Sequence, residues 1–404
     1  MNHVPLGDDV PGELICVKVP DWAGDIAVDG NLLAYSGCLS GDPSARSDWR
    51  RFDWIAVAWH MLNGTSERAH EQRNGPVLSY AFRLPEELHL LFDRAWANRI
   101  FLFLRRWAAR EERMSEEQLF GTVPKAEIVL THDVDAIRLT PEIRLKQTAF
   151  QLANALRSAT HARFLQAGVR LVDAARFAFS PGDLRTIGRI REMEQAAGLR
   201  SVFHFYGGPA GWARRTPRRM LIDPGYDVGS PYVAGEIGAL RDGGWQVGLH
   251  QSFEAWSSPA SMERERQRVE AVSGAPVVHC RQHWLRFSWE TTWRAQERAG
   301  LAVDSTLGFN DRPGFRAGHA LRLFPWDRAA GIPMQLAVMP MVMMDSQFYD
   351  YAQLSADAAG PGMKRWIDEI RAVGGEASVN WHPHTITGLY GWGKGFEDLL
   401  GLLS

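Results

Sequence analysis

Histidine and aspartate residues follow directly after short apolar runs in this 404-residue chain. Of its 13 histidines, seven lie at the ends of such runs: His132, His204, His250, His279, His283, His382 and His384. Imidazole and carboxylate groups bind divalent metals and move protons, so their convergence would form a polar catalytic pocket. Histidines with purely structural roles should be more scattered along the sequence.

The first of these runs ends in Thr131-His132-Asp133-Val134-Asp135. If the strand stays extended, Asp133 and Asp135 project from one face and His132 from the other. Two carboxylates this close repel each other, and a divalent metal between or beside them would relieve the repulsion. The alternative is that one aspartate caps the segment that follows.

A second candidate ligand pair follows the run that ends at His250. His250 and Glu254 are four residues apart, so a helical turn would align them on one side. With a carboxylate from the first run they would form a mixed nitrogen and oxygen site with open positions for water, as in catalytic zinc sites. The alternatives are a hydrogen-bonded structural histidine and a surface glutamate.

The elements that must position these residues begin at residue 126. Six apolar runs of strand length occupy residues 128–131, 201–205, 245–249, 276–280, 301–305 and 376–381. The helical stretches between them end at five glycines, Gly198, Gly243, Gly274, Gly300 and Gly374. Glycine adopts the left-handed conformation that ends many helices, so the repeated units predict a parallel α/β fold, a distorted (β/α) barrel. Catalytic groups in such folds follow the C-terminal ends of the strands, where the histidines and aspartates lie.

The first third of the chain has a different character. It carries six tryptophans and polar, turn-forming stretches, and no residues in it have catalytic spacing. We expect an N-terminal accessory module of unknown role over residues 1–115 and the barrel over residues 124–404.

Residues 138–180 interrupt the alternation of strands and helices. Leu152 and Leu156, like Leu165, Val169 and Val172, are spaced as on helices. Seven basic and two acidic residues lie between positions 138 and 176. One interpretation is a helical insertion with a solvated basic face, and the other is a face for an anionic lipid-linked or nucleotide-linked glycan.

Overall charge and hydropathy exclude several classes of protein. The formal net charge of −2 gives no basic excess of the kind that drives nucleic-acid binding. No apolar run approaches the roughly 18 residues of a membrane-spanning helix. The first residues do not resemble a secretory signal, so we expect a cytoplasmic protein. Three widely spaced cysteines predict neither a disulfide framework nor a cysteine zinc site, and no pattern indicates the oligomeric state.

The order of the motifs resembles that of the polysaccharide deacetylase family, also called the NodB-homology family or carbohydrate esterase family 4. The motifs are THDVD at 131–135, His250 in VGLHQSFEAW, Arg281 in CRQHWLRF, Asp304 in DSTLGF with GFRAG at 314–318, and His382 in NWHPHT. The resemblance covers about residues 126–390 and is greatest to a divergent, WbmS-like branch from surface-polysaccharide gene clusters. It implies a barrel of the NodB-homology type.

The resemblance also implies catalytic roles. Asp133 matches the general base, Arg281 the arginine that orients the base, and His382 the general acid, for which His384 is the fallback. The implied ligands of a divalent ion, expected to be zinc, are Asp135, His250 and Glu254. The family has an aspartate and a second histidine where this chain has Val134 and Glu254. The residues expected to contact the substrate are His132, His283, Trp284 and His384.

Together these features predict a metal-dependent hydrolase that removes an N-acyl group, expected to be acetyl, from a sugar. Its substrate would be an N-acylated glycan or sugar nucleotide of a bacterial surface polysaccharide or its precursor. The alternative is a non-catalytic glycan-binding or scaffold relative of the deacetylases in a polysaccharide assembly system.

Overall fold

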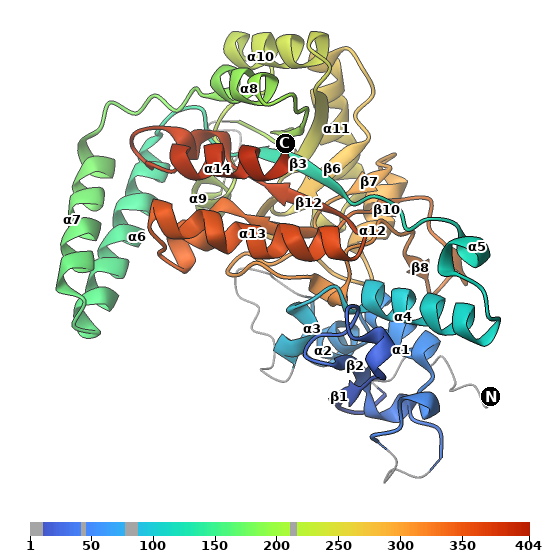
Figure 1. The fold of residues 1–404 in the computed structure, drawn as a ribbon. Coiled ribbons are helices and arrows are strands. Elements are labelled where there is room, and N and C mark those ends of the chain that lie inside the picture. The colour runs from blue at the N-terminus through green and yellow to red at the C-terminus, as the bar shows by residue number, and fades with distance from the viewer. Residues whose placement is uncertain (1–10, 42–45, 77–87, 211–215) are drawn as a thin grey trace.

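The structure, a computed structural model, describes residues 11–41, 46–76, 88–210 and 216–404 (Figure 1). Its centre is an eight-stranded sheet in the order β10-β7-β6-β5-β4-β3-β12-β11. Every neighbouring pair in this sheet is parallel. The strands are β3 (Glu127–Val134), β4 (Val202–Tyr206), β5 (Gln246–Gln251), β6 (His279–Gln282), β7 (Val303–Asp304), β10 (Ala337–Val338), β11 (Met341–Met344) and β12 (Glu376–Asn380).

The sheet is curled, and its edge strands β10 and β11 are consecutive in the chain, separated only by Met339 and Pro340. In the described part of the chain no strand pairing joins these two edges. The main-chain N–H of Met341, at the start of β11, donates to the carbonyl of Leu307, 2.8 Å away. The curled parallel sheet and its helices therefore form a distorted (β/α) barrel, as the alternation of strands and helices predicted.

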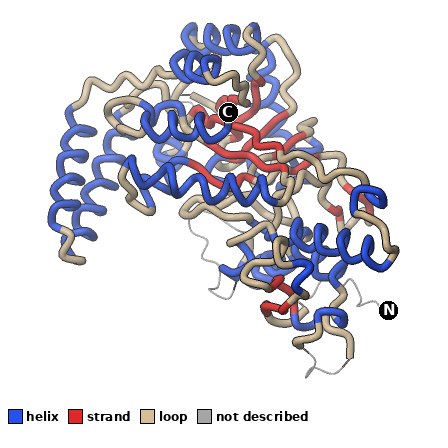
Figure 2. The backbone as a smooth tube through the Cα atoms, in the orientation of Figure 1, coloured by secondary structure: helices blue, strands red, loops and turns tan. Residues whose placement is uncertain are grey.

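Helices surround the strands, which occupy the interior (Figure 2). They are α8 (Ile187–Ala196), α9 (Pro217–Ile222), α10 (Pro231–Asp242), α11 (Pro259–Ser273), α12 (Thr292–Arg298), α13 (Ala356–Ala372) and α14 (Gly393–Leu403). Most of them bury an apolar stripe; Val233, Ile237 and Leu240 of α10, for example, are fully buried. One predicted helix end differs by a residue, because Gly243 has φ −89° and Gly244, with φ +85°, makes the left-handed turn.

The six strands expected from the sequence are all present as β3, β4, β5, β6, β7 and β12. The two edge strands, β10 and β11, were not expected, because Pro340 divides their apolar run into strands of two and four residues. A short antiparallel pair, β8 (Trp326–Asp327) and β9 (Ile332–Pro333), lies outside the barrel sheet.

The N-terminal part has its own apolar core, to which Leu33, Trp54 and Phe103 belong. Its elements are β1 (Leu14–Lys18), β2 (Asn31–Tyr35), α1 (Trp54–Leu62), α2 (Thr65–Asn74), α3 (His89–Phe92), α4 (Trp96–Glu111) and α5 (Glu116–Phe120). Buried ion pairs join it to the barrel: Glu67 of α2 contacts Arg316 at 2.9 Å, and Arg99 of α4 contacts Glu369 at 2.6 Å. The division into residues 1–115 and 124–404 stays a prediction.

The segment at 138–180 forms two antiparallel helices, α6 (Pro141–Thr160) and α7 (Phe164–Phe179), as its apolar spacing predicted. Thr140 caps α6 by accepting a hydrogen bond from the main-chain N–H of Ile143. In the described part of the chain, no helix is both long and apolar enough to cross a membrane.

Candidate functional site

The C-terminal ends of β3, β5, β6 and β12 open into a cavity of about 180 Å³. Five of the polar side chains that line it come from these strands or the residues just beyond them: Asp133, Asp135, His250, His283 and His382. Asp133 and Asp135 both reach the cavity because alternate residues of a strand share a face. The predicted convergence of histidines and aspartates at the strand ends is therefore found for these five residues.

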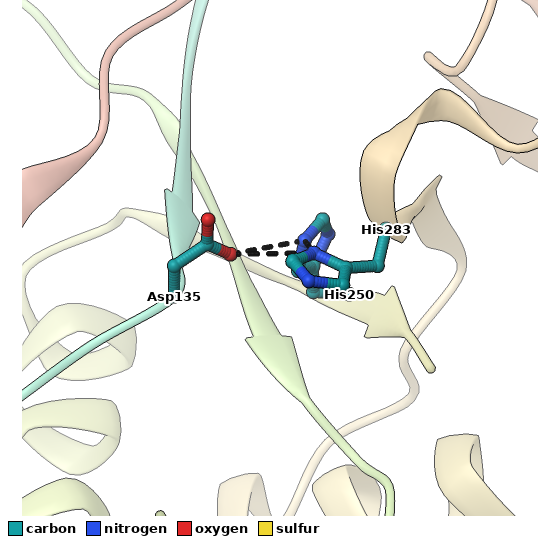
Figure 3. Close-up of side chains that lie close together, drawn as sticks. All are labelled: Asp135, His250 and His283. Atoms are coloured by element: carbon teal, nitrogen blue, oxygen red, sulfur yellow. Dashed lines mark hydrogen bonds and ion pairs between the residues drawn. The ribbon is translucent and has the colours of Figure 1, made fainter. Parts of the chain in front are cut away.

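Asp135, His250 and His283 form a group that could hold a metal ion (Figure 3). Asp135 Oδ1 lies 3.2 Å from His250 Nε2 and 3.5 Å from His283 Nδ1. The two imidazole nitrogens are 2.7 Å apart. One nitrogen or oxygen atom from each side chain lies within 4.8 Å of the other two, so a single ion could contact all three.

The hydrogen bonds of the two histidines decide which nitrogens are free to bind a cation. His250 Nδ1 lies 3.1 Å from the carbonyl oxygen of Arg281, and His283 Nε2 lies 2.8 Å from that of Ile222. A carbonyl only accepts, so both of these ring nitrogens donate their proton. In the neutral rings, His250 Nε2 and His283 Nδ1 then face each other with lone pairs. A proton on one nitrogen, or a cation bound between them, would relieve this contact at 2.7 Å, and the donor set fits a divalent metal.

The surroundings shift the pKa values of His283 and His250 in opposite directions. Burial lowers the pKa of His283 to about 4, despite the nearby Asp135, so this ring stays neutral. Burial also disfavours the charged form of His250, but Asp133 and Asp135 outweigh it and raise the pKa of this histidine. Burial opposes ionisation of Asp135, yet the neighbouring histidines, His283 first, hold its pKa well below the usual range. The carboxylate is thus available as an anionic ligand.

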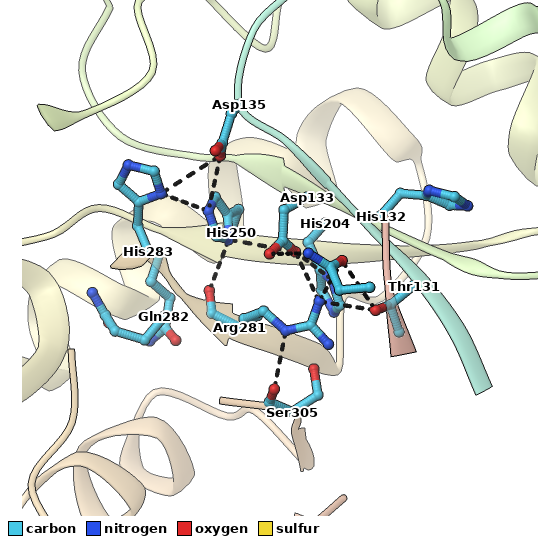
Figure 4. A network of polar contacts seen from close by, with 12 residues as sticks. Thr131, His132, Asp133, Asp135, His204, His250, Arg281, Gln282, His283 and Ser305 are labelled. Carbon is cyan, nitrogen blue, oxygen red and sulfur yellow. Dashed lines mark hydrogen bonds and ion pairs between the residues drawn. The ribbon is translucent and has the colours of Figure 1, made fainter. Parts of the chain in front are cut away.

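Asp133 lies deeper, in a network centred on Arg281 (Figure 4). Arg281 Nη1 donates to Asp133 Oδ1 at 3.1 Å, and Asn380 Nδ2 donates to Asp133 Oδ2 at 3.1 Å. His204 Nδ1 lies 3.2 Å from Asp133 Oδ1. Burial favours the protonated acid, but the charges of Arg281 and His250 dominate and hold the pKa of Asp133 well below its usual range. Asp133 is therefore ionised, and cationic neighbours, rather than a raised pKa, resolve the repulsion expected between the two aspartates.

Arg281 is fully buried and held by the ends of several strands. Its Nε donates to the carbonyl of Ser305, and its Nη1 also donates to Thr131 Oγ1 and to Asn380 Oδ1, at 2.7 to 3.0 Å. A guanidinium fixed at this many points cannot swing away from Asp133. Its geometry matches the predicted role of orienting the base.

His382 follows β12 and pairs with a residue that the sequence did not suggest. Its Nδ1 lies 2.6 Å from Oδ1 of Asp345, whose Oδ2 accepts hydrogen bonds from the main-chain N–H of His382 and from Thr385 Oγ1. Burial disfavours the imidazolium, but the buried Asp345 outweighs it and raises the pKa of His382 to about 10. His382 therefore carries a proton on Nε2 at neutral pH, and this atom lies 3.6 Å from Asp135 Oδ2.

A signal for Asp345 was present in the sequence. The residue comes directly after the apolar run that forms β11. It therefore obeys the same strand-end rule as Asp133 and His250, namely that functional side chains lie at or just beyond the C-terminal ends of the parallel strands. The run at 341–344 is not one of the six apolar runs from which strands were predicted, so the sequence analysis missed Asp345.

The structure does not bring Glu254 to the other predicted ligands. Glu254 Oε2 accepts a hydrogen bond from Arg286 Nη1 at 2.7 Å, and its Oε1 lies 3.5 Å from Arg218 Nε. The chain is a turn at Glu254, so the expected helical alignment with His250 does not form. His283, expected to contact the substrate, takes the place beside His250.

His132 also differs from the prediction. It lies on the opposite face of β3 from the cavity, fully buried, with Nδ1 2.7 Å from the carbonyl of Trp381 and Nε2 2.5 Å from Glu194 Oε1. A substrate cannot reach this side chain, so we correct its role to a structural one.

Trp284 and His384 line the cavity as expected. Trp284 and Leu285 have φ of 58° and 47°, a left-handed conformation that is unfavourable for such side chains and is often found at functional sites. Asn310 Nδ2 holds this turn by donating to the carbonyl of Trp284 at 2.8 Å. Lys146 Nζ of α6 lies 4.4 Å from the centre of the Trp284 ring, so the insertion helix contributes to the wall of the cavity.

Comparison with known proteins gives matches only among solved structures, since no protein-family model and no curated protein matches the chain. A structure described as a putative polysaccharide deacetylase from Mycobacterium smegmatis is 15% identical, with a TM-score of 0.42 over 70% of this chain and 85% of that one. A family 4 carbohydrate esterase from Streptomyces lividans is 12% identical, with a TM-score of 0.27 over 68% and 88% of the two chains. A pseudoenzyme of the same family from Bacillus anthracis is 10% identical, with a TM-score of 0.28 over 70% and 60%. These structures come from the family that the motifs resemble, and at such identities their activities are not assigned to this chain.

Proposed function

We propose that the protein is a metal-dependent hydrolase that removes the acetyl group from an N-acetylated sugar. The observation that carries the proposal is the group of Asp135, His250 and His283, in which two imidazole nitrogens face each other 2.7 Å apart beside a carboxylate. Two imidazoles and one carboxylate with positions left for water are the donor set of many catalytic zinc sites. A bound divalent ion would lower the pKa of a water molecule and polarise the amide carbonyl.

The side chains around this group supply the proton transfers of amide hydrolysis. Asp133, ionised and held by Arg281, accepts a proton from the water whose oxygen forms the new bond to the amide carbon. His382, protonated through Asp345, donates its Nε2 proton to the amide nitrogen as the carbon–nitrogen bond breaks. The products are acetate and an amine, and both of the side chains that transfer protons line the same cavity.

The substrate follows from the resemblance and from the shape of the cavity. A volume of about 180 Å³ accepts one sugar ring rather than a buried chain, and Trp284 offers an aromatic face for it. We therefore propose an N-acetylated sugar at the accessible end of a surface-polysaccharide precursor or of a sugar nucleotide. The cytoplasmic location expected from the sequence stays a prediction.

The test compares metal content and acetate release. Elemental analysis of the purified wild-type protein should find about one divalent ion per chain, and His283→Ala should lose it. Glu254→Ala is the matched control, because Glu254 was the ligand expected from the sequence but lies in ion pairs with arginines. Retention of the ion in His283→Ala with loss in Glu254→Ala would refute the ligand set. A wild-type protein that binds one ion but releases no acetate from N-acetylated glycans or sugar nucleotides would support the non-catalytic alternative.

A further inference from the structure

The hairpin of α6 and α7 stands apart from the rest of the surface. Figure 1 shows α7 at the outer edge of the molecule, with α6 between it and the barrel. In the described part of the chain, nine of the 21 large apolar side chains that are exposed lie on these two helices. Single exposed apolar residues are ordinary on a protein surface, but a concentration of this kind marks an interaction site.

On α7 most of the large apolar side chains lie on the face that is exposed to solvent, and not on the face that packs against the rest of the protein. The buried positions are Ala167, Ala174 and Phe177. Leu165, Val169, Val172 and Phe179 share the opposite stripe by their spacing of four, three and seven residues, and Leu165 and Phe179 are each 87% exposed. Most of the larger apolar residues of this helix thus point to solvent, whereas Phe177 and two alanines face the protein.

Helix α6 repeats the pattern. Leu145, Leu152 and Leu156 form an exposed stripe by their spacing of seven and four residues. The inner positions of α6 are polar or small and include Gln151, Asn154 and Ala155. Both helices of the hairpin therefore present leucine-rich faces that no described part of the chain covers.

The hairpin is also basic. Between residues 138 and 176 the chain has seven basic and two acidic residues, although the whole chain has a formal charge of −2. Arg157, Arg163 and Arg176 are exposed beside the apolar stripes. Two copies of such a face would repel each other, whereas an anionic surface with an apolar interior would match both the charge and the leucines.

We propose that the α6–α7 hairpin docks the protein onto the surface of an anionic lipid bilayer, with its leucine and phenylalanine side chains at the headgroup boundary. Helix α6 also contributes Lys146, Gln147 and Phe150 to the wall of the cavity. Docking would therefore place the mouth of the cavity near the lipid surface. The proposal rests on the exposed hairpin alone and does not depend on the proposed hydrolase activity.

The test is sedimentation of the full chain with vesicles. Wild-type protein should bind vesicles of phosphatidylcholine mixed with phosphatidylglycerol, bind pure phosphatidylcholine much less, and be released by high salt. The triple variant L165S/V169S/V172S should reduce the partition coefficient at least about tenfold. Its matched control, I55S/F324S/I332S, removes three exposed apolar residues elsewhere and should bind as the wild type does.

A second pair of variants tests the charge. R157Q/R163Q/R176Q should weaken binding by about fivefold for each arginine. R189Q/R264Q/R298Q changes the net charge equally at exposed positions outside the hairpin and should have little effect. Unchanged circular dichroism and thermal unfolding establish that each variant is folded. If the triple variant L165S/V169S/V172S does not fold, the single variant L165S is used in its place.

The proposal is overturned if wild-type protein binds neither kind of vesicle, or if the control variants weaken binding as much as the hairpin variants do. It is also overturned if light scattering shows a wild-type oligomer that L165S/V169S/V172S converts to monomer while vesicles bind neither form. In that case a second copy of the chain covers the hairpin.

Discussion

Replacing Asp345 by asparagine should convert His382 from a charged acid into a largely neutral imidazole at neutral pH. The side-chain contact is direct, with His382 Nδ1 2.6 Å from Asp345 Oδ1, and both groups are shielded from solvent. At an effective dielectric of about 20, a charge pair at about 4 Å is worth roughly 4 kcal/mol, or roughly 3 in pKa. The pKa of His382, about 10 in the wild type, should then fall to about 7.

Nuclear magnetic resonance of the histidine ring protons measures this pKa directly, with H382Q to assign the signal. D398N is the control, because Asp398 is paired with Lys394 on α14 and has no contact with the site. The reasoning is refuted if His382 of the wild type titrates near its ordinary value of about 6.5, or if D345N leaves its pKa unchanged.

The same contact has a consequence for stability. Because the pKa of His382 is higher in the folded than in the unfolded chain, the pair stabilises the fold fully below pH of about 6.5. That contribution is lost as the pH rises towards about 10, the folded value. D345N should remove this part of the pH dependence, which denaturant unfolding at pH 6 and pH 9.5 would detect.

Two further predictions concern the base and a buried acid near the site. D133N should lower the rate of acetate release at least about 10²–10⁴-fold while one metal ion is retained, and equal rates in the two proteins would reject the assigned base. Burial raises the pKa of Glu265, which accepts hydrogen bonds from Ser252, to about 7. Because this acid loses its proton more readily in the unfolded than in the folded chain, raising the pH favours unfolding. The free energy of unfolding should therefore fall by roughly 3 kcal/mol between pH 4.5 and 7.5. E265Q should flatten this dependence, whereas E263Q, at an exposed position of the same helix, should not.

The strand-end rule accounts for most of what the sequence could predict about the site. It selected Asp133, Asp135, His250 and His382, all of which line one cavity. It works because all neighbouring strands of the sheet are parallel, so that their C-terminal ends meet at one mouth. Because β12 pairs with β3, Asp133 and His382 come from the C-terminal ends of neighbouring strands.

The ligand beside His250 could not be predicted from spacing along the chain. Four residues separate His250 from Glu254, but they align only on a helix, and the chain turns after β5 instead. His283 is 33 residues from His250 in the sequence, but the two lie close together in the sheet. His250 of β5 pairs with Arg281 of β6, Gln251 pairs with Gln282, and His283 is the next residue after Gln282. Proximity across neighbouring strands thus decides the ligand set, and a single sequence contains the strands but not their register.

Strand order also explains why the acid and the metal ligands do not interfere with each other. His250 and His283 come from β5 and β6, whereas His382 and Asp345 follow β12 and β11, on the other side of β3 in the sheet. Asp135, which follows β3, lies 3.2 Å from His250 Nε2 and 3.6 Å from His382 Nε2. A cation held by Asp135 would repel the imidazolium of His382, and Asp345 offsets that repulsion by placing a buried anion on the far side of the ring. The contact with Asp345 therefore keeps His382 protonated beside Asp135, and the edge strand β11 positions this partner of His382.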